Sequence, residues 1–314
     1  MTDRSTPEPA ASPEPAAAAG PATAQGPAAG GITVPDPAGP EATPVSSLDL
    51  AGIRLVASDV DGTLLHDWQP IPAPTVAAIR DCLGAGVPFV PVTGRPLRWL
   101  APVHASVPEL GPVICANGSI VYDLAQARVL TAHTIDAAVL REFVGLVRAR
   151  MPAAVLGFET LAGLLLEPEF RTRFPADATW IDPADSPHVR DVVKVILRTG
   201  SRDSDAILAQ VRDVIGPVLH ATHSNPRNGL VELSANGVTK ARTLATWCAE
   251  AGIAADQVAA FGDMPNDIEM LEWAGHSFAM ANGHPDALAA AGGIAPAVHD
   301  GGIAEVLRTI AAHR

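Results

Sequence analysis

Cysteine, positive charge and long apolar runs are all scarce in this chain of 314 residues. Its three cysteines (Cys82, Cys115 and Cys248) are far apart and form no CxxC or Cys/His cluster, which argues against a zinc site and is typical of a reducing compartment. The 21 basic residues against 34 acidic ones give a net charge of −13. Nucleic acids and anionic membranes would be repelled by this charge.

No segment is long and apolar enough to cross a bilayer, and the N-terminus has neither the basic start nor the apolar block of a secretory signal. We therefore expect a cytoplasmic protein without a membrane or nucleic-acid partner. We also expect a monomer or weak homo-oligomer whose ligand is a small molecule.

The first 47 residues differ in composition from the rest of the chain. Ala, Pro, Gly, Ser and Thr dominate there, and ten of the 29 prolines fall in this segment. Such a sequence cannot bury enough apolar surface to offset the entropy lost on ordering. We expect residues 1–47 to form a disordered tail that serves as a spacer or solubility element, and a docking motif is the alternative interpretation.

Beyond the tail, apolar runs of strand length alternate with segments of helical spacing. We predict strands at 53–58, 87–92, 112–116, 258–261 and 277–280, and helices at 74–83, 238–251 and 265–273, followed by two more. This alternation predicts an α/β fold, a doubly wound parallel sheet of the Rossmann-like type with helices on both faces. The carboxyl ends of its strands share one edge, where such sheets bind ligands.

A domain-sized segment between residues 125 and 227 interrupts this pattern with elements of its own. We predict helices at 136–150 and 201–215, and strands at 154–158, 164–167, 192–197 and 218–221. The expected organisation is a catalytic core made of residues 48–124 and 228–314, with an inserted α/β cap formed by 125–227.

The most informative motifs are carboxylates that follow predicted strands. Asp59 and Asp61 stand at the end of the first strand, where Gly62 lets the chain turn. One carboxylate can attack phosphorus while the second transfers protons. The Asp-x-Asp-Gly pattern alone fits an acidic loop or a calcium-binding turn as well as it fits a catalytic site. The apolar strand before it and the Thr-Leu-Leu segment after it favour catalysis.

The segment from Gly262 to Asp267 also joins a predicted strand to a helix. Asp263 and Asp267, four residues apart at that junction, suit an oxygen-liganded cation such as Mg²⁺, although Asp267 could also simply complement a helix dipole.

Thr93 and Gly94 follow the second strand and could cradle an anion, or Thr93 could only cap a helix. Arg95 beside them could touch phosphate or brace the loop. Lys240 opens a helix, where an ammonium would neutralise a phosphoryl group; most lysines, however, are solvated surface residues.

In this order, the motifs resemble those of the haloacid dehalogenase superfamily, and more narrowly the Cof-type phosphatases with a type IIB cap. The resemblance runs from about residue 53 to the end of the chain. It is carried by Asp59-x-Asp61-Gly-Thr-Leu-Leu, Val92-Thr93-Gly94-Arg95, Asn117-Gly118, Gly237-Val238-Thr239-Lys240 and Gly262-Asp263-x-x-Asn266-Asp267-x-x-Met270. Ala241 departs from the family pattern, where glycine is usual after the lysine, and the asparagine expected near Val298-His299 is missing.

The resemblance implies a role for each matched position. Asp59 would be the nucleophile and Asp61 the general acid/base, while Thr93, Gly94, Lys240 and Asn266 would surround the phosphoryl group. The implied cofactor, Mg²⁺, would be bound by the Asp59 carboxylate, the Asp61 main-chain carbonyl and Asp263, with Asp267 as a ligand or a support.

We therefore expect a Mg²⁺-dependent phosphatase that hydrolyses a small phosphorylated metabolite, a sugar phosphate or similar, through an aspartyl-phosphate. A phosphomutase or phosphotransferase would use the same intermediate, and a phospho-accepting signalling module is a further alternative. The cap would select the substrate, and its polar candidates, which could equally be surface residues, are Arg171, Arg173, His223, Asn225 and Arg227.

Overall fold

The computed structural model describes residues 40–66 and 68–314. The predicted disordered tail lies mostly outside these residues and stays a prediction. The ordered chain nevertheless begins before residue 47. The Thr43 amide donates to the Ile294 carbonyl at 2.9 Å, its hydroxyl accepts from the Ile294 amide at 2.9 Å, and Val45 packs against the core.

The core sheet has five parallel strands. In spatial order they are β14 (Gly293–Ala295), β13 (His276–Met280), β12 (Val258–Gly262), β1 (Leu55–Ser58) and β2 (Phe89–Pro91). All residues of β1 and β12 are buried, as expected for central strands covered on both faces.

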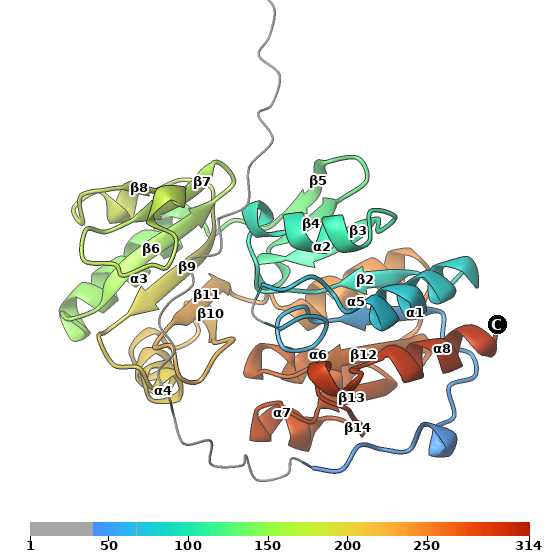
Figure 1. Cartoon of the computed structure of the whole chain (residues 1–314). Helices are drawn as coiled ribbons and strands as arrows, with labels where there is room; N and C mark the ends of the chain where they lie inside the picture. The colour runs from blue at the N-terminus through green and yellow to red at the C-terminus, as the bar shows by residue number, and fades with distance from the viewer. Residues whose placement is uncertain (1–39, 67) are drawn as a thin grey trace, which may run out of the picture. The chain divides into compact units, whose positions relative to one another are not determined.

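Helices cover both faces of this sheet (Figure 1). Val56 of β1 packs in one cluster with α1 (Ala73–Gly84), α2 (Ala101–Ser106) and α8 (Ala304–Ala312). Leu55 and Ala57 pack on the other face with α5 (Lys240–Glu250) and α6 (Ile268–Trp273). A further short helix, α7 (Pro285–Ala290), contacts α6 and β13. The predicted doubly wound α/β core is confirmed.

A three-stranded antiparallel sheet stands beside β2. It consists of β3 (Pro112–Cys115), β4 (Ile120–Asp123) and β5 (Arg128–Ala132), and a single bridge between Val92 and Ile114 links it to the end of β2. The predicted strand at 112–116 exists, but the left-handed backbone of Ala116 and Asn117 turns the chain straight back into β4. The strand therefore lies parallel to the end of β2 through this bridge and also begins an antiparallel meander.

The inserted segment forms a six-stranded sheet. Its strands, in spatial order, are β10 (Leu219–Thr222), β11 (Val231–Ala235), β9 (Val192–Arg198), β6 (Val155–Thr160), β7 (Gly163–Leu166) and β8 (Ala178–Trp180). Two helices, α3 (Ala137–Arg150) and α4 (Ser204–Ile215), share one apolar cluster with β6, β9, β10 and β11. Every helix and strand predicted inside this segment has a counterpart.

The expected cap limits of 125 and 227 differ from this sheet at both ends. Strand β5 lies beyond residue 125 but pairs with β4, whereas β11 lies beyond residue 227 and pairs with β9 and β10. The limits themselves stay a prediction, and from here the cap means the six-stranded sheet with α3 and α4. No helix of the described residues is long and apolar enough to cross a membrane.

Candidate active site

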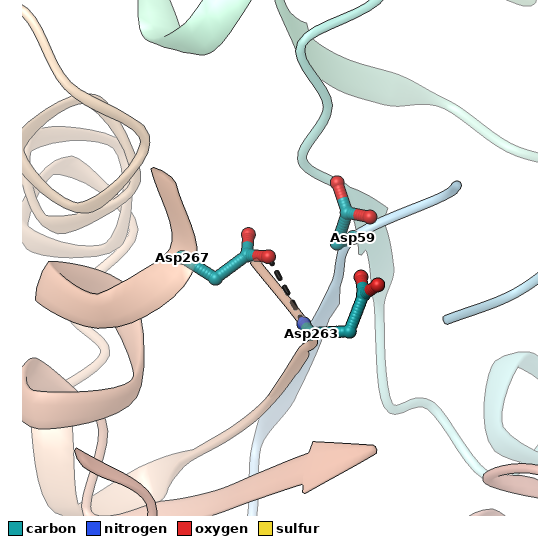
Figure 2. Close-up of side chains that lie close together, drawn as sticks. All are labelled: Asp59, Asp263 and Asp267. Carbon is teal, nitrogen blue, oxygen red and sulfur yellow. Dashed lines mark hydrogen bonds between the residues drawn. The ribbon is translucent and has the colours of Figure 1, made fainter. Parts of the chain in front are cut away.

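The carboxyl ends of two neighbouring parallel strands bring the predicted carboxylates together. Asp59 directly follows β1, and Asp263 directly follows β12, its partner in the sheet. Asp267 approaches from the short 3-10 turn Pro265–Asp267. Figure 2 shows the three carboxyl groups side by side, and one oxygen of each lies within 4.8 Å of the others. All three residues are buried.

Asp267 shapes the loop that carries Asp263. Its Oδ2 accepts the backbone N–H groups of Asp263 and Met264, each at 3.0 Å, so it satisfies donors that the start of a helix leaves free (Figure 2). A Cβ on Gly262 would lie 2.5 Å from the Cβ of Asp267, which explains the glycine before Asp263. This loop is therefore built around the Asp267 side chain.

Lys240 is the buried cation of the site. It is the first residue of α5, and its Nζ donates to Asp59 Oδ1 at 2.5 Å and to Asp267 Oδ1 at 2.7 Å. Burial lowers the pKa of Lys240, but Asp267 and Asp59 together raise it above its ordinary value. The side chain is thus held as an ammonium between two carboxylates.

Negative charge still exceeds positive charge in this cluster. Burial is the main cause that raises the pKa of Asp59 from 3.8 to about 7; Lys240 lowers it, and Asp267 raises it further. Burial and the charge of Asp59 also raise the pKa of Asp263 well above its ordinary value, although Thr63 donates to its Oδ1 at 3.0 Å. Buried carboxylate oxygens with uncompensated charge are the donor set that fits a hard cation such as Mg²⁺.

Gly62 lets the turn after Asp61 lie directly against the Asp263 carboxylate. Its φ of +89° is in the left-handed region, and a Cβ there would lie 2.3 Å from Asp263 Oδ2. The Asp-x-Asp-Gly turn therefore fits closely against the second carboxylate.

Asp61 pairs with Arg95. The guanidinium donates from Nε and Nη2 to both Asp61 oxygens, and its Nη1 donates to the Trp99 carbonyl at 3.2 Å. The Arg95 side chain is buried, whereas that of Asp61 is half exposed. Of the two roles weighed for Arg95, bracing is the one that these contacts support.

The other predicted phosphate-binding residues, Thr93, Gly94 and Asn266, lie in two loops that contact Asn117. Thr93, two residues beyond β2, is fully buried, and its hydroxyl accepts the Arg95 amide at 3.1 Å. Asn266 donates to Asn117 Oδ1 at 3.0 Å, and its own Oδ1 is buried without a hydrogen bond in the described chain. A Cβ on Gly94 would lie 3.0 Å from the same Asn117 oxygen, so Gly94 permits this close approach.

The sequence had not pointed to Lys194 and Glu232. Both are buried charged residues of the cap sheet, and each interrupts an apolar run, Val192-Val193-Lys194-Val195 and Val231-Glu232-Leu233. A lone charge inside a buried strand was the available signal. Among the polar cap candidates that the sequence did suggest, His223 is buried against Asp205, and the other four (Arg171, Arg173, Asn225 and Arg227) are exposed.

Comparison with known proteins shows the family of the chain. The model of a family described as haloacid dehalogenase-like hydrolase matches residues 56–307. The chain is similar to the phosphoglycolate phosphatase of Methanothermobacter thermautotrophicus, with 26% identity over 82% of this chain and 98% of that protein. It is also similar to a 5-amino-6-(5-phospho-D-ribitylamino)uracil phosphatase of Bacillus subtilis, with 28% identity over 73% of this chain and 87% of that protein.

Solved structures share the fold. A protein of Streptococcus mutans superposes with a TM-score of 0.72 at 21% identity, over 83% of this chain and 99% of that one. A haloalkanoate-superfamily phosphatase of Bacteroides thetaiotaomicron gives 0.69 at 22% identity, over 82% and 95%. At these identities the similarity concerns the arrangement of core and cap.

Proposed function

The chain belongs to the haloacid dehalogenase-like hydrolase family, and from that premise we propose that it is a Mg²⁺-dependent phosphatase of a small phosphorylated metabolite. Family, fold and the enzyme class, a phosphatase, agree with the prediction from the motifs. The names of the relatives refer to different phosphate esters. They therefore support the type of reaction but no particular substrate, which we expect the cap to select.

One observation carries the proposal: the buried group of Asp59, Lys240, Asp263 and Asp267. Lys240 holds Asp59 Oδ1, while Asp59 Oδ2 takes part in no hydrogen bond within the described chain. Oδ2 is thus the oxygen left for attack. The cluster combines a fixed nucleophile, a permanent cation and a carboxylate set for a metal, which are the parts that phosphoryl transfer needs.

In the first step Asp59 Oδ2 attacks phosphorus, and the bond from phosphorus to the ester oxygen breaks. Asp61, protonated on one oxygen while Arg95 holds the other, gives this proton to the departing alkoxide, so an alcohol leaves and an aspartyl-phosphate remains. In the second step Asp61 takes a proton from water as that water attacks phosphorus. The bond to Asp59 breaks, and inorganic phosphate and the free carboxylate are regenerated.

Magnesium would be held by the Asp59 carboxylate, the Asp61 main-chain carbonyl and Asp263, with Asp267 beside them. When bound, the ion neutralises charge on the nucleophile and the phosphate that must approach each other. Asp267 supports this arrangement from the protein side, because it fixes the backbone of Asp263 and shares Lys240 with Asp59.

Thr93, Gly94, Lys240 and Asn266 are proposed to surround the phosphoryl oxygens. The buried, unpaired Oδ1 of Asn266 shows a polar group without a partner at this place. Its amide nitrogen uses one N–H for Asn117, and the second N–H is the donor that Asn266 would offer to an anion.

Release of inorganic phosphate from a panel of phosphate esters, with and without Mg²⁺, tests the proposal. Wild-type protein should release phosphate, and Asp59→Asn should lower turnover by several orders of magnitude because an amide cannot attack phosphorus. A purified, folded wild-type enzyme that isomerises phosphate esters without releasing phosphate would point to a mutase. A stable phosphoprotein without turnover would point to signalling.

A further inference from the structure

Three half-buried aromatic rings, two from the core and one from the cap, pack against one another. Trp68 lies in the core loop that precedes α1, Trp99 ends the 3-10 turn Leu97–Trp99, and Phe174 lies in the cap loop between β7 and β8. The ring centroids of Trp68 and Trp99 are 5.0 Å apart, and those of Phe174 lie 5.2 and 5.3 Å from them. Each pair meets edge to face, which is a favoured arrangement of aromatic rings. The cluster is therefore a packed contact between cap and core.

A polar contact beside the rings involves the same two segments. Trp99 Nε1 donates to Asp177 Oδ2 at 3.3 Å, and Arg98 Nε lies 3.6 Å from the same oxygen. Asp177 belongs to the 3-10 turn Pro175–Asp177, which directly follows Phe174. The cap loop thus contacts the core through a ring and through a carboxylate.

The Trp68 ring also covers one side of Arg95. The guanidinium carbon of Arg95 lies 4.3 Å above the centre of this ring, within the range of a cation–π contact. The nitrogens of the same group donate to both oxygens of Asp61 and to the Trp99 carbonyl. Because the guanidinium is planar, these hydrogen bonds hold its edges, and the ring blocks its movement toward Trp68. Trp68 therefore restricts the group that orients Asp61.

The backbone of Trp68 indicates that the place of this ring is specified by its surroundings. Its φ is +63°, in the left-handed region that bulky aromatic residues rarely adopt. Such a conformation persists only where neighbouring contacts determine it, and residues of this kind gather at functional sites. Here the contacts are those with Trp99, Phe174 and Arg95.

We propose that Trp68 is a positioning residue for proton transfer by Asp61, that it acts through Arg95, and that Phe174 of the cap holds its ring in place. This proposal rests on the proposed phosphatase function. Without the ring, the guanidinium can move away and take the Asp61 carboxyl out of line with the leaving oxygen. Misplacements of this size are costly in rate.

Two esters of similar size test the proposal when each is assayed with Mg²⁺. Benzyl phosphate releases an alkoxide that needs a proton, whereas p-nitrophenyl phosphate releases a stabilised phenolate that needs little. Comparison by kcat/KM reports the loss of transition-state stabilisation for each ester. Trp68→Leu should lower this value by about 10-fold or more for benzyl phosphate and by less than about 3-fold for p-nitrophenyl phosphate. Phe174→Leu should change the ratio of the two values in the same direction, by about 3- to 10-fold.

Two further variants separate positioning from a structural role. Trp68→Tyr keeps an aromatic face for the guanidinium and should restore most of the ratio. Phe170→Leu alters a buried ring of the same cap loop that packs in a separate cluster with Leu164 and Leu166. It should lower the melting temperature and leave the ratio unchanged.

A double-mutant cycle tests whether Trp68 acts through Arg95. In an Arg95→Lys background the parallel hydrogen bonds to Asp61 are already lost, so Trp68→Leu should change the ratio by less than about 2-fold. The same cycle remains available with Phe174→Leu if Trp68→Leu does not fold.

An unchanged ratio in Trp68→Leu or in Phe174→Leu would overturn the proposal, as would a full effect of Trp68→Leu in the Arg95→Lys background. A wild type that hydrolyses only the p-nitrophenyl ester would overturn it too, because no proton donor would then be acting. Release of phosphate from neither ester would instead contradict the phosphatase function on which the proposal rests.

Discussion

Arg95 donates to both carboxylate oxygens of Asp61, from Nε at 2.7 Å and from Nη2 at 2.6 Å. The guanidinium lies 4.3 Å from the centre of the Trp68 ring and is held by the Trp99 carbonyl as well. A half-exposed carboxylate would otherwise sample several rotamers. This pairing fixes the orientation of Asp61, the residue proposed to move the proton.

Arg95→Lys should therefore impair proton transfer more than phosphoryl binding, because a lysine cannot form the two parallel hydrogen bonds. We expect kcat for an alkyl phosphate to fall by about 10- to 100-fold, less than the roughly 100- to 10,000-fold that general acid catalysis contributes in full, because Asp61 itself remains. Turnover of p-nitrophenyl phosphate, whose leaving group needs little protonation, should fall much less. Equal losses with both substrates would show that Arg95 does not act through Asp61.

A second prediction concerns Gly62. Gly62→Ala places a Cβ 2.3 Å from Asp263 Oδ2 in a left-handed backbone, so the carboxylate must move, and activity should fall by about 100-fold or more. Gly86→Ala is the matched control: its φ of +76° is also left-handed, but no atom lies within 4 Å of the added Cβ. It should cost about 1–2 kcal/mol of stability and leave kcat unchanged. Similar activity in the two variants would exclude the proposed contact.

A third prediction concerns pH and metal. The pKa of Asp59 is raised from 3.8 to about 7 in the fold, so the metal-free folded protein holds a proton that the unfolded chain has lost across this window. Its stability should therefore decrease as pH rises through the window, and Mg²⁺, which needs ionised carboxylates, should stabilise the fold more at about pH 8 than at about pH 5. Thermal unfolding with Mg²⁺ or EDTA measures both effects.

Asp263→Asn is the control for this prediction, because it removes one carboxylate from the cluster. It should flatten the pH dependence of the metal-free protein and reduce the stabilisation by Mg²⁺. A larger effect of Mg²⁺ at the lower pH in the wild type would contradict the assignment of this cluster as the metal site.

A fourth prediction concerns the N-terminal segment. Removal of residues 1–47 also removes Thr43, its two hydrogen bonds with Ile294 and the packing of Val45 on the core. It should lower the free energy of unfolding by roughly 1–3 kcal/mol relative to removal of residues 1–39. Equal melting temperatures of the two truncated proteins would show that residues 40–47 contribute nothing to the fold.

The sequence predicted the central residues of the site because they directly follow predicted strands. Asp59 and Asp263 each follow an apolar run of strand length, and in a parallel sheet such ends meet on one edge. Local signals were enough for these residues.

Local sequence signals could not predict contacts that depend on which strands pair with one another. The Lys194–Glu232 pair exists because β11 lies beside β9, and β11 is a short strand with alternating polar residues that the apolar pattern does not reveal. Arg95 was found, but its pairing with Asp61 depends on how two loops meet at the sheet edge. These contacts are therefore set by tertiary packing, which the local sequence pattern does not reveal.

The central claim is that Asp59 carries the phosphoryl group, and a rapid acid quench during turnover tests it most directly. Peptide mass spectrometry of the quenched wild-type enzyme should show one added phosphoryl group on the peptide with Asp59, removable by hydroxylamine, and none in Asp59→Asn. Steady release of phosphate by an enzyme that never shows this adduct, or an adduct on another residue, would contradict the account.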